Sequence, residues 1–233
     1  MFMMKRLTVI IAFMLCVGSV MAQYEKGECY FRPYMGLMFS NMESKAFHSS
    51  CDLKWKVNMT LGGQFEWQLL KSSSLLMDAN YRRQGCMIDY NGYYGNTDGD
   101  DKMTVDFLNF GLQWKMYLKP NLSARVGIEL MSKVGNLTTH YRVYGEDVSV
   151  DEEDKEGGSE IIDQAMWSVP IGLSFEYKNF TFSATYHLDG NRICEAISPD
   201  DGVHSAWESW SEPVYFYTFD FTCGYTIPLR KKK

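Results

Sequence analysis

Apolar and polar residues alternate strictly along most of the chain beyond residue 29. Over residues 53–69 every odd position is apolar or glycine, and the even positions are polar apart from Gly62. A period of two is the signature of a β-strand whose two faces meet different surroundings. Strands in globular proteins are usually five or six residues long, so this segment predicts an unusually long strand.

The same alternation recurs in seven further segments, which gives eight predicted strands. Their expected bounds are 29–40, 53–69, 74–88, 103–118, 122–134, 164–177, 180–190 and 214–227. The connections at 71–73, 119–121 and 178–179 are short, whereas those near 41–52, 89–102, 135–163 and 191–213 are long. Short turns at one rim and long loops at the other, with an even strand count, are typical of outer-membrane barrels. The predicted fold is all-β: an eight-stranded antiparallel up-and-down transmembrane β-barrel, with the first strand beside the eighth and both termini at the short-turn rim.

Glycines and charges indicate which face points inward. Six glycines in different segments share the polar face: Gly36, Gly62, Gly111, Gly127, Gly172 and Gly224. They would weaken a solvated outer face, but they suit the lumen of an eight-stranded barrel, which has little room for side chains. We also assign twelve charged residues to this face: Arg32, Lys54, Lys56, Arg82, Lys115, Arg125, Glu66, Asp78, Asp106, Glu129, Glu176 and Asp220. Since opposite charges can neutralise one another in a packed interior, the polar face is expected inside, with ion pairs among Arg32, Glu66, Arg82, Glu129, Arg125 and Glu176.

Large aromatic residues lie near both ends of the apolar face. Toward the short-turn rim they are Trp67, Trp114, Tyr177 and Tyr225, and toward the long-loop rim Trp55, Tyr81, Trp167 and Tyr186. Two such girdles mark the membrane–water interfaces of a transmembrane barrel. The alternative is a soluble, lipocalin-like ligand carrier whose core these rings fill, which the inward glycines and charges disfavour.

The N-terminus has the pattern of a secretory signal peptide. Lys5 and Arg6 precede an apolar run over residues 7–17, and Val20 and Ala22 occupy the −3 and −1 positions of a cleavage site. The run is too short to span a bilayer as a helix. We therefore expect a signal peptide over residues 1–22 and a barrel domain over 23–233.

The amino-acid composition limits the classes of partner that the protein is expected to bind. Without residues 1–22, which carry two basic residues and no acids, 21 basic residues face 29 acidic ones, a net charge of −8. An acidic chain argues against nucleic acid, which leaves membrane lipid as the expected partner of a monomer. Five cysteines remain, at positions 29, 51, 86, 194 and 223. Their spacing fits no zinc motif, so bridges or buried thiols are expected.

Several segments resemble the PorT-like outer-membrane β-barrels common in Bacteroidota. "RPYMGLMFSNM" is similar to the family's first strand, "SSLLMDANYRRQG" to its third, "DFLNFGLQWKMYL" to its fourth and "FDFTCGYTIPL" to the closing one. The chain departs from the family at Gly111, where proline is common, and in ending on four basic residues. The resemblance implies a location in the outer membrane and a barrel shape more than an activity.

The long loops carry the remaining candidate chemistry. Residues 146–160 contain eight carboxylates and one lysine, and residues 96–101 partly resemble a calcium loop without its bidentate glutamate. A cation or a surface partner could bind these acidic loops, although a solvated charged loop explains them as well. We expect the connection 138–162 to be extended and mobile. Trp207 and Trp210 could stack on a partner or pack onto the barrel mouth.

His187 is the one candidate general base, on the inward face near Thr185 and Asp189. A serine–histidine mechanism needs a nucleophile and an orienting acid, and no G-x-S-x-G motif is present. The leading hypothesis is a structural or surface-interaction barrel with a filled lumen, with no catalysis, no catalytic residue, no metal and no cofactor. The alternatives are a lipid-modifying enzyme built on the barrel and the soluble carrier.

Overall fold

The computed structural model describes residues 25–44, 51–90, 101–134, 138–143, 146–151, 165–189 and 214–230. Side-chain environments are described for 25–41, 53–87, 102–134, 165–189 and 215–229. Within this part of the chain, no helix is both long enough and apolar enough to cross a bilayer.

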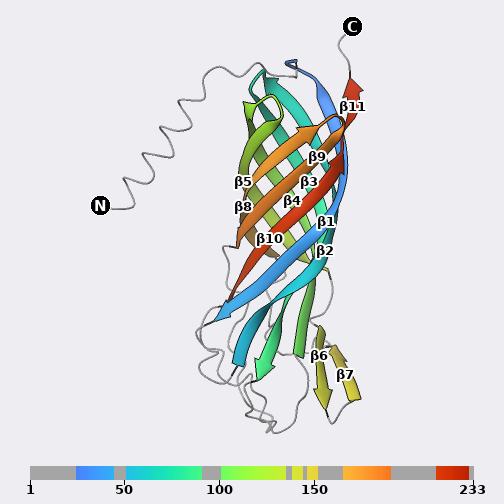
Figure 1. Ribbon diagram of the computed structural model, residues 1–233, viewed down its shortest axis with the longest axis vertical. Coiled ribbons are helices and arrows are strands. Elements are labelled where there is room, and N and C mark those ends of the chain that lie inside the picture. The colour runs from blue at the N-terminus through green and yellow to red at the C-terminus, as the bar shows by residue number, and fades with distance from the viewer. Residues whose placement is uncertain are drawn as a thin grey trace, which may run out of the picture.

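Eight long strands form one closed antiparallel barrel (Figure 1). They are β1 (Cys29–Ser44), β2 (Cys51–Leu70), β3 (Ser73–Tyr90), β4 (Asp101–Lys119), β5 (Leu122–Lys133), β8 (Ala165–Tyr177), β9 (Phe180–Asp189) and β10 (Val214–Tyr225). Each pairs with its neighbour in sequence, and β1 closes the barrel against β10 with Gly36 opposite Thr222. The predicted fold, strand number and closure are confirmed.

The short turns gather at one rim of the barrel, as predicted. The β8–β9 connection is only two residues long, and Lys178 adopts a positive φ of 56° there, as tight hairpin turns require. At the same rim, the backbone N–H of Gly27 donates to the Gln68 carbonyl at 2.8 Å. The short strand β11 (Ile227–Arg230) continues from β10 and pairs with the start of β1. Both ends of the described chain therefore lie at the short-turn rim (Figure 1).

One long connection contains a hairpin that the alternation analysis missed. Strand β6 (Thr138–Val143) pairs with β7 (Glu146–Asp151), and its first residues continue the sheet beside β4, with Thr138 opposite Thr104. The expectation of an extended connection is thus wrong for its first half. The rest of that predicted connection, residues 144–145 and 152–162, lies outside the described residues.

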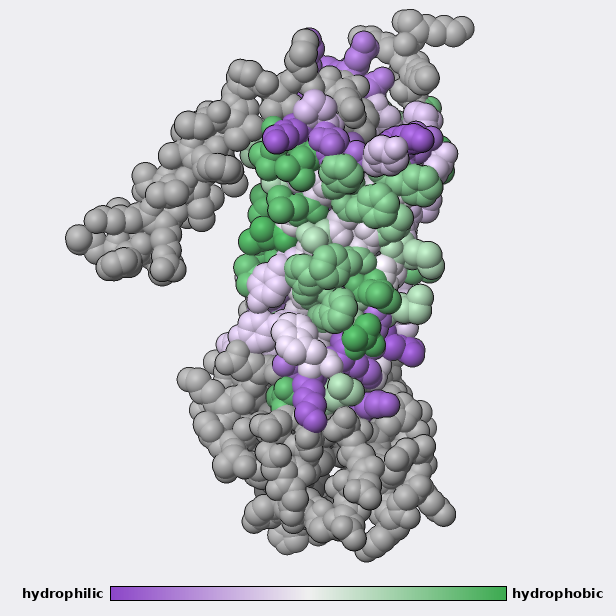
Figure 2. Space-filling view, in the orientation of Figure 1, coloured by the Kyte–Doolittle hydropathy of each residue, from purple (hydrophilic) through white to green (hydrophobic). Residues whose placement is uncertain are grey.

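The outer surface of the barrel is apolar. Figure 2 shows a hydrophobic band between hydrophilic residues on either side of it. Seven of the eight predicted girdle aromatics are exposed on this surface, and Tyr186 is half-buried. An apolar exterior around a polar interior is the reverse of a soluble barrel, so the carrier alternative is excluded.

The lumen is narrow, and glycines permit its close packing. A Cβ atom added at Gly36 would lie 2.2 Å from the Phe221 carbonyl oxygen, and one at Gly127 would lie 2.2 Å from that of Leu112. Neither position can accept a side chain without movement of the neighbouring backbone. Gly111 differs, because its added Cβ would meet only ordinary contacts at 3.5 Å and beyond.

Two charged residues were assigned to the wrong face. Asp106 has the parity of Leu108 and Phe110 on β4, and it lies outside, where its carboxylate accepts from Arg83 at 2.8 Å. Lys54 is exposed beyond the irregular pairing of β2 with β3 between Trp55 and Thr60. Lys56 does turn inward, where its ammonium donates to the Met103 carbonyl at 3.2 Å.

Candidate functional site

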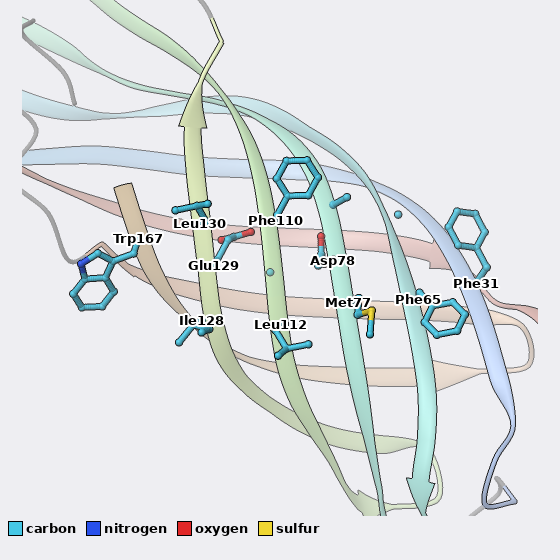
Figure 3. Close-up of a pocket in the computed structure, with 13 residues that line it drawn as sticks. Phe31, Phe65, Met77, Asp78, Phe110, Leu112, Ile128, Glu129, Leu130 and Trp167 are labelled. Carbon is cyan, nitrogen blue, oxygen red and sulfur yellow. The ribbon is translucent and has the colours of Figure 1, made fainter. Parts of the chain in front are cut away.

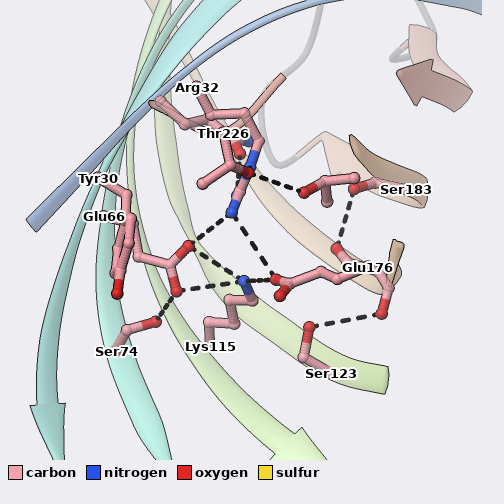
Figure 4. A network of polar contacts seen from close by, with 12 residues as sticks. Tyr30, Arg32, Glu66, Ser74, Lys115, Ser123, Glu176, Ser183 and Thr226 are labelled. Carbon is pink, nitrogen blue, oxygen red and sulfur yellow. Dashed lines mark hydrogen bonds and ion pairs between the residues drawn. The ribbon is translucent and has the colours of Figure 1, made fainter. Parts of the chain in front are cut away.

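The lumen near the short-turn rim holds a turn-side cluster of two cations and two anions, namely Arg32, Lys115, Glu66 and Glu176 (Figure 4). They come from β1, β4, β2 and β8, and all four side chains are buried. Glu66 accepts from Arg32 at 2.9 Å and from Lys115 at 3.1 Å. Lys115 also contacts Glu176, which lies 3.7 Å from Arg32. The four charges form a closed ring that is neutral overall.

Neutral groups complete the coordination of Glu66. The Tyr117 and Ser74 hydroxyls each donate to its Oε1 at 2.6 Å. The Arg32 Nε donates at 3.0 Å to the hydroxyl of Thr226, which lies between β10 and β11 next to β1. A buried carboxylate is tolerated only when its lone pairs are satisfied in this way. The cluster therefore blocks the lumen with fully paired charges.

A central cluster of Arg82, Glu129, His187 and Asp220 lies further toward the long-loop rim. Arg82 forms a bidentate pair with Glu129, with N–O distances of 2.8 and 3.0 Å. His187 contacts Asp220 through Nε2 at 2.8 Å and Glu129 through Nδ1 at 3.4 Å. Asn80 donates to Glu129 at 3.0 Å. Five of the six predicted ion-pair residues are thus found in ion pairs, in this cluster or the turn-side one.

The environment of His187 argues against catalysis. Both ring nitrogens contact charged groups, since Nδ1 also lies 3.2 Å from a guanidinium nitrogen of Arg82. The side chain is only 1% exposed. A general base needs a reachable proton on the substrate, and no lipid on the outer wall can reach this ring. The geometry fits a residue that links two carboxylates in the lumen.

Arg125 and Asp189 are bound less completely than the residues around them. Arg125 was expected in an ion pair, but its guanidinium donates to the Thr185 hydroxyl and is not within 4.0 Å of a carboxylate in the described structure. The Asp189 carboxylate faces the hydroxyl of Ser168, its register partner on β8, but neither carboxylate oxygen forms a hydrogen bond of ordinary geometry among the described residues. The central region thus contains one cation and one acid that do not form an ion pair with each other.

The loop-side end of the lumen is closed by apolar side chains, a feature that the face assignment overlooked. This loop-side cap consists of Met103, Phe107, Met131, Met166 and Phe216, each at most 1% exposed. The Phe107 and Phe216 rings meet edge to face, with centroids 6.4 Å apart. The strand alternation could have predicted this cap, because Met103 and Phe107 occupy odd positions on β4, as the inward-facing Lys115 does.

The loop candidates are largely untested. The possible calcium loop at 96–101, Trp207 and Trp210 lie outside the residues whose side chains are described. Within the described part, no group of three or more His, Cys, Asp or Glu residues is placed to hold a metal. Cys29 and Cys223 carry free thiols, and Cys86 is buried, while positions 51 and 194 lie outside the described side chains.

A closed antiparallel barrel with an apolar exterior and a charged interior is the architecture of an outer-membrane β-barrel. Comparison with known families agrees, because the family model described as "Outer membrane protein beta-barrel domain" matches residues 21–188. The chain belongs to this family, and its location is the outer membrane.

Solved structures of similar fold are distant in sequence. Neisserial surface protein A is 10% identical, with 84% of this chain and 97% of that chain covered and a TM-score of 0.47. Ail of Yersinia pestis, solved with the heparin analogue sucrose octasulfate, is 13% identical, with 87% and 100% covered and a TM-score of 0.42. The E. coli outer membrane protein W is 15% identical, with 88% and 100% covered and a TM-score of 0.41. No curated protein matches the sequence.

Proposed function

We propose that this protein is a closed membrane anchor, which conducts no solute and presents its long-loop rim to partners at the cell surface. The observation that carries the proposal is the double closure of the lumen. The turn-side cluster fills it with paired charges, and the loop-side cap fills it with apolar side chains. An eight-stranded barrel is only wide enough for its own side chains, so two filled levels leave no continuous path for water or ions.

Conductance in a planar lipid bilayer tests this proposal. We expect the purified wild-type barrel to add no stable current steps to a bare bilayer in 1 M KCl. The matched positive control removes both closures, through Phe107→Ser and Phe216→Ser in the cap with Glu66→Ser and Lys115→Ser in the cluster. This variant should conduct if it folds, which heat-modifiable migration in a gel checks. Stable current steps from the wild-type barrel would refute the closed anchor.

The second part of the proposal is that the acidic residues 146–160 bind a partner. Eight carboxylates within residues 146–160 favour a cationic or cation-bridged partner, and loops on a rigid scaffold commonly carry binding residues. Limited proteolysis with and without millimolar calcium tests this point. Cleavage within 146–160 that calcium suppresses supports a cation-organised loop, whereas cleavage that ignores calcium contradicts it.

The finer identity is also a proposal. Four strand segments support membership of the PorT-like barrels of Bacteroidota, and the N-terminal pattern supports removal of residues 1–22 before a monomeric barrel inserts. Mass spectrometry of the protein isolated from outer membranes should find Gln23 at the N-terminus. The neighbouring genes in the genome of origin would show which envelope process the barrel serves.

A further inference from the structure

The apolar outer wall contains a hollow of about 690 Å³ (Figure 3). It crosses β1 to β5 and reaches Trp167 on β8. Its size falls within the range of roughly 300–1,000 Å³ that small-molecule sites occupy. Of the ion-paired residues of the lumen only Glu129 contributes to the lining, and its carboxylate turns into the lumen, so the hollow is a separate feature of the outer wall.

The hollow arises because two neighbouring rows of outward side chains differ in size. One row crosses five strands as register partners and is bulky throughout: Phe31, Phe65, Met77, Leu112 and Ile128. The next row toward the long-loop rim is Gly63, Ala79, Phe110, Leu130 and Trp167. On β2 and β3 this second row has almost no side chain, so Gly63 and Ala79 form a floor between taller neighbours.

Aromatic and thioether side chains form the walls around this floor. A Cβ atom added at Gly63 would lie 3.1 Å from the Phe31 ring, which therefore stands directly at its edge. Phe110 rises on the other side of Ala79 and is 53% exposed, and Met77 is 48% exposed. Figure 3 shows Met77 and Phe65 side by side in the bulky row, with Phe110 across from them.

The bulky row lies in the half of the membrane next to the short turns. Phe31 is two residues from the start of β1, Met77 is four from the start of β3, and Phe65 is five from the end of β2. With a rise of about 3.4 Å per residue and a strand tilt of about 45°, these positions lie within roughly 15 Å of the turn rim. The floor residues lie deeper, because Gly63 is seven residues from the end of β2 and Ala79 is six from the start of β3, roughly 14–17 Å from the turn rim. The hydrocarbon layer is about 30 Å thick, so the hollow begins in the leaflet at the short-turn rim and reaches the middle of the membrane.

We propose that the hollow binds one acyl chain of a phospholipid from the leaflet at the short-turn rim. The chemistry of the lining selects an alkyl chain, because the exposed walls are apolar. The two lining carboxylates, Asp78 and Glu129, turn into the lumen, where they accept hydrogen bonds from Tyr34 at 2.8 Å and Arg82 at 2.8 Å. The hollow continues the lipid-facing band, so the surrounding bilayer supplies its occupant directly. A flexible chain can follow a groove with a ring at each side, whereas a second barrel presents a convex wall to it.

Filling the floor tests the proposal. Ala79→Phe places a ring over the hollow, and Ala184→Phe is the matched control, an outward alanine on β9 beside Phe221 and Leu173. Each barrel is incubated in detergent with palmitoyl-oleoyl phosphatidylethanolamine and measured by native mass spectrometry. We expect wild type and Ala184→Phe to retain one phospholipid at equal levels, and Ala79→Phe to retain it at least fivefold less.

Three results would overturn the proposal. Equal retention by all three proteins would show that the hollow holds no chain. A dimer that Ala79→Phe abolishes would assign the hollow to a second copy of the barrel. Retention that falls severalfold when phosphatidylglycerol replaces phosphatidylethanolamine, with the same acyl chains, would place recognition at the headgroup. Heat-modifiable migration confirms that each variant is folded before its lipid content is compared.

Discussion

The two ends of the lumen are both filled with side chains, but one end is filled with charged groups and the other with apolar groups. The turn-side cluster fills its level with four buried charges that neutralise one another, whereas the loop-side cap fills its level with methionine and phenylalanine. A charged level is stable only while every partner is present, because an unpaired buried charge is costly. An apolar level loses stability in proportion to the atoms removed, and methionine can adapt to a gap. The two levels should therefore respond differently to single substitutions.

The largest effect is expected when the turn-side cluster loses one cation. Lys115→Met keeps the length of the side chain but leaves Glu66 and Glu176 facing Arg32 alone. Removing one partner of a buried ion pair typically costs about 3–5 kcal/mol. Urea titration of the barrel in lipid vesicles measures the loss in the free energy of unfolding.

Lys119→Met is the control for this experiment, because Lys119 lies on the same strand but is exposed at the turn rim. Its free energy of unfolding should stay within about 0.5 kcal/mol of wild type. Equal effects of the two substitutions would mean that the turn-side cluster contributes nothing through its charges.

A smaller effect is expected in the loop-side cap. Phe107→Ala removes a fully buried ring and its contact with Phe216. We expect a loss of about 3 kcal/mol, the low end for a buried phenylalanine, because the neighbouring methionines can move into the space. The same urea titration measures it.

Phe110→Ala on the same strand provides the comparison, because that ring faces the lipid. Lipid can fill the space it leaves, so the loss should be clearly smaller than for Phe107→Ala. A larger loss at position 110 would show that lipid contacts stabilise the barrel more than the cap does.

The alternation of residues predicts the fold because a transmembrane barrel imposes it on every strand. It identified the eight strands, their closure and both girdles, since lipid and lumen demand opposite polarity at each step. The odd or even position of a residue along its strand also predicts which face of the barrel it lies on, even where its polarity suggests the opposite face. Asp106 is polar but has the outward parity of β4, and Phe107 is apolar but has the inward one.

Other features depend on spatial neighbours that no linear pattern reveals. The hairpin of β6 and β7 extends the sheet because β6 pairs with the first residues of β4. This contact joins segments that are far apart in the sequence. The hollow depends on Gly63 lying opposite Ala79, which requires the register of two strands. Arg125 reaches Thr185 across Gly172, because Gly172 lies opposite Arg125 on one side and opposite Thr185 on the other.

The smallest predicted effect concerns the central region, between the turn-side cluster and the loop-side cap, and it is a gain in stability and not a loss. Asp189 sits on the inward face of β9, and neither of its carboxylate oxygens forms a hydrogen bond of ordinary geometry among the described residues. Removing its charge should relieve a desolvation cost that the Ser168 hydroxyl and the nearby His187 and Arg82 offset only in part. We therefore expect Asp189→Asn to raise the free energy of unfolding by about 1 kcal/mol at neutral pH.

Asp220→Asn is the matched control, because Asp220 is bonded to His187 at 2.8 Å. It should lower the free energy of unfolding by about 1.5–3 kcal/mol. Destabilisation by both substitutions would mean that the partners of Asp189 offset its desolvation cost in full, and the central region would then resemble the fully paired turn-side cluster.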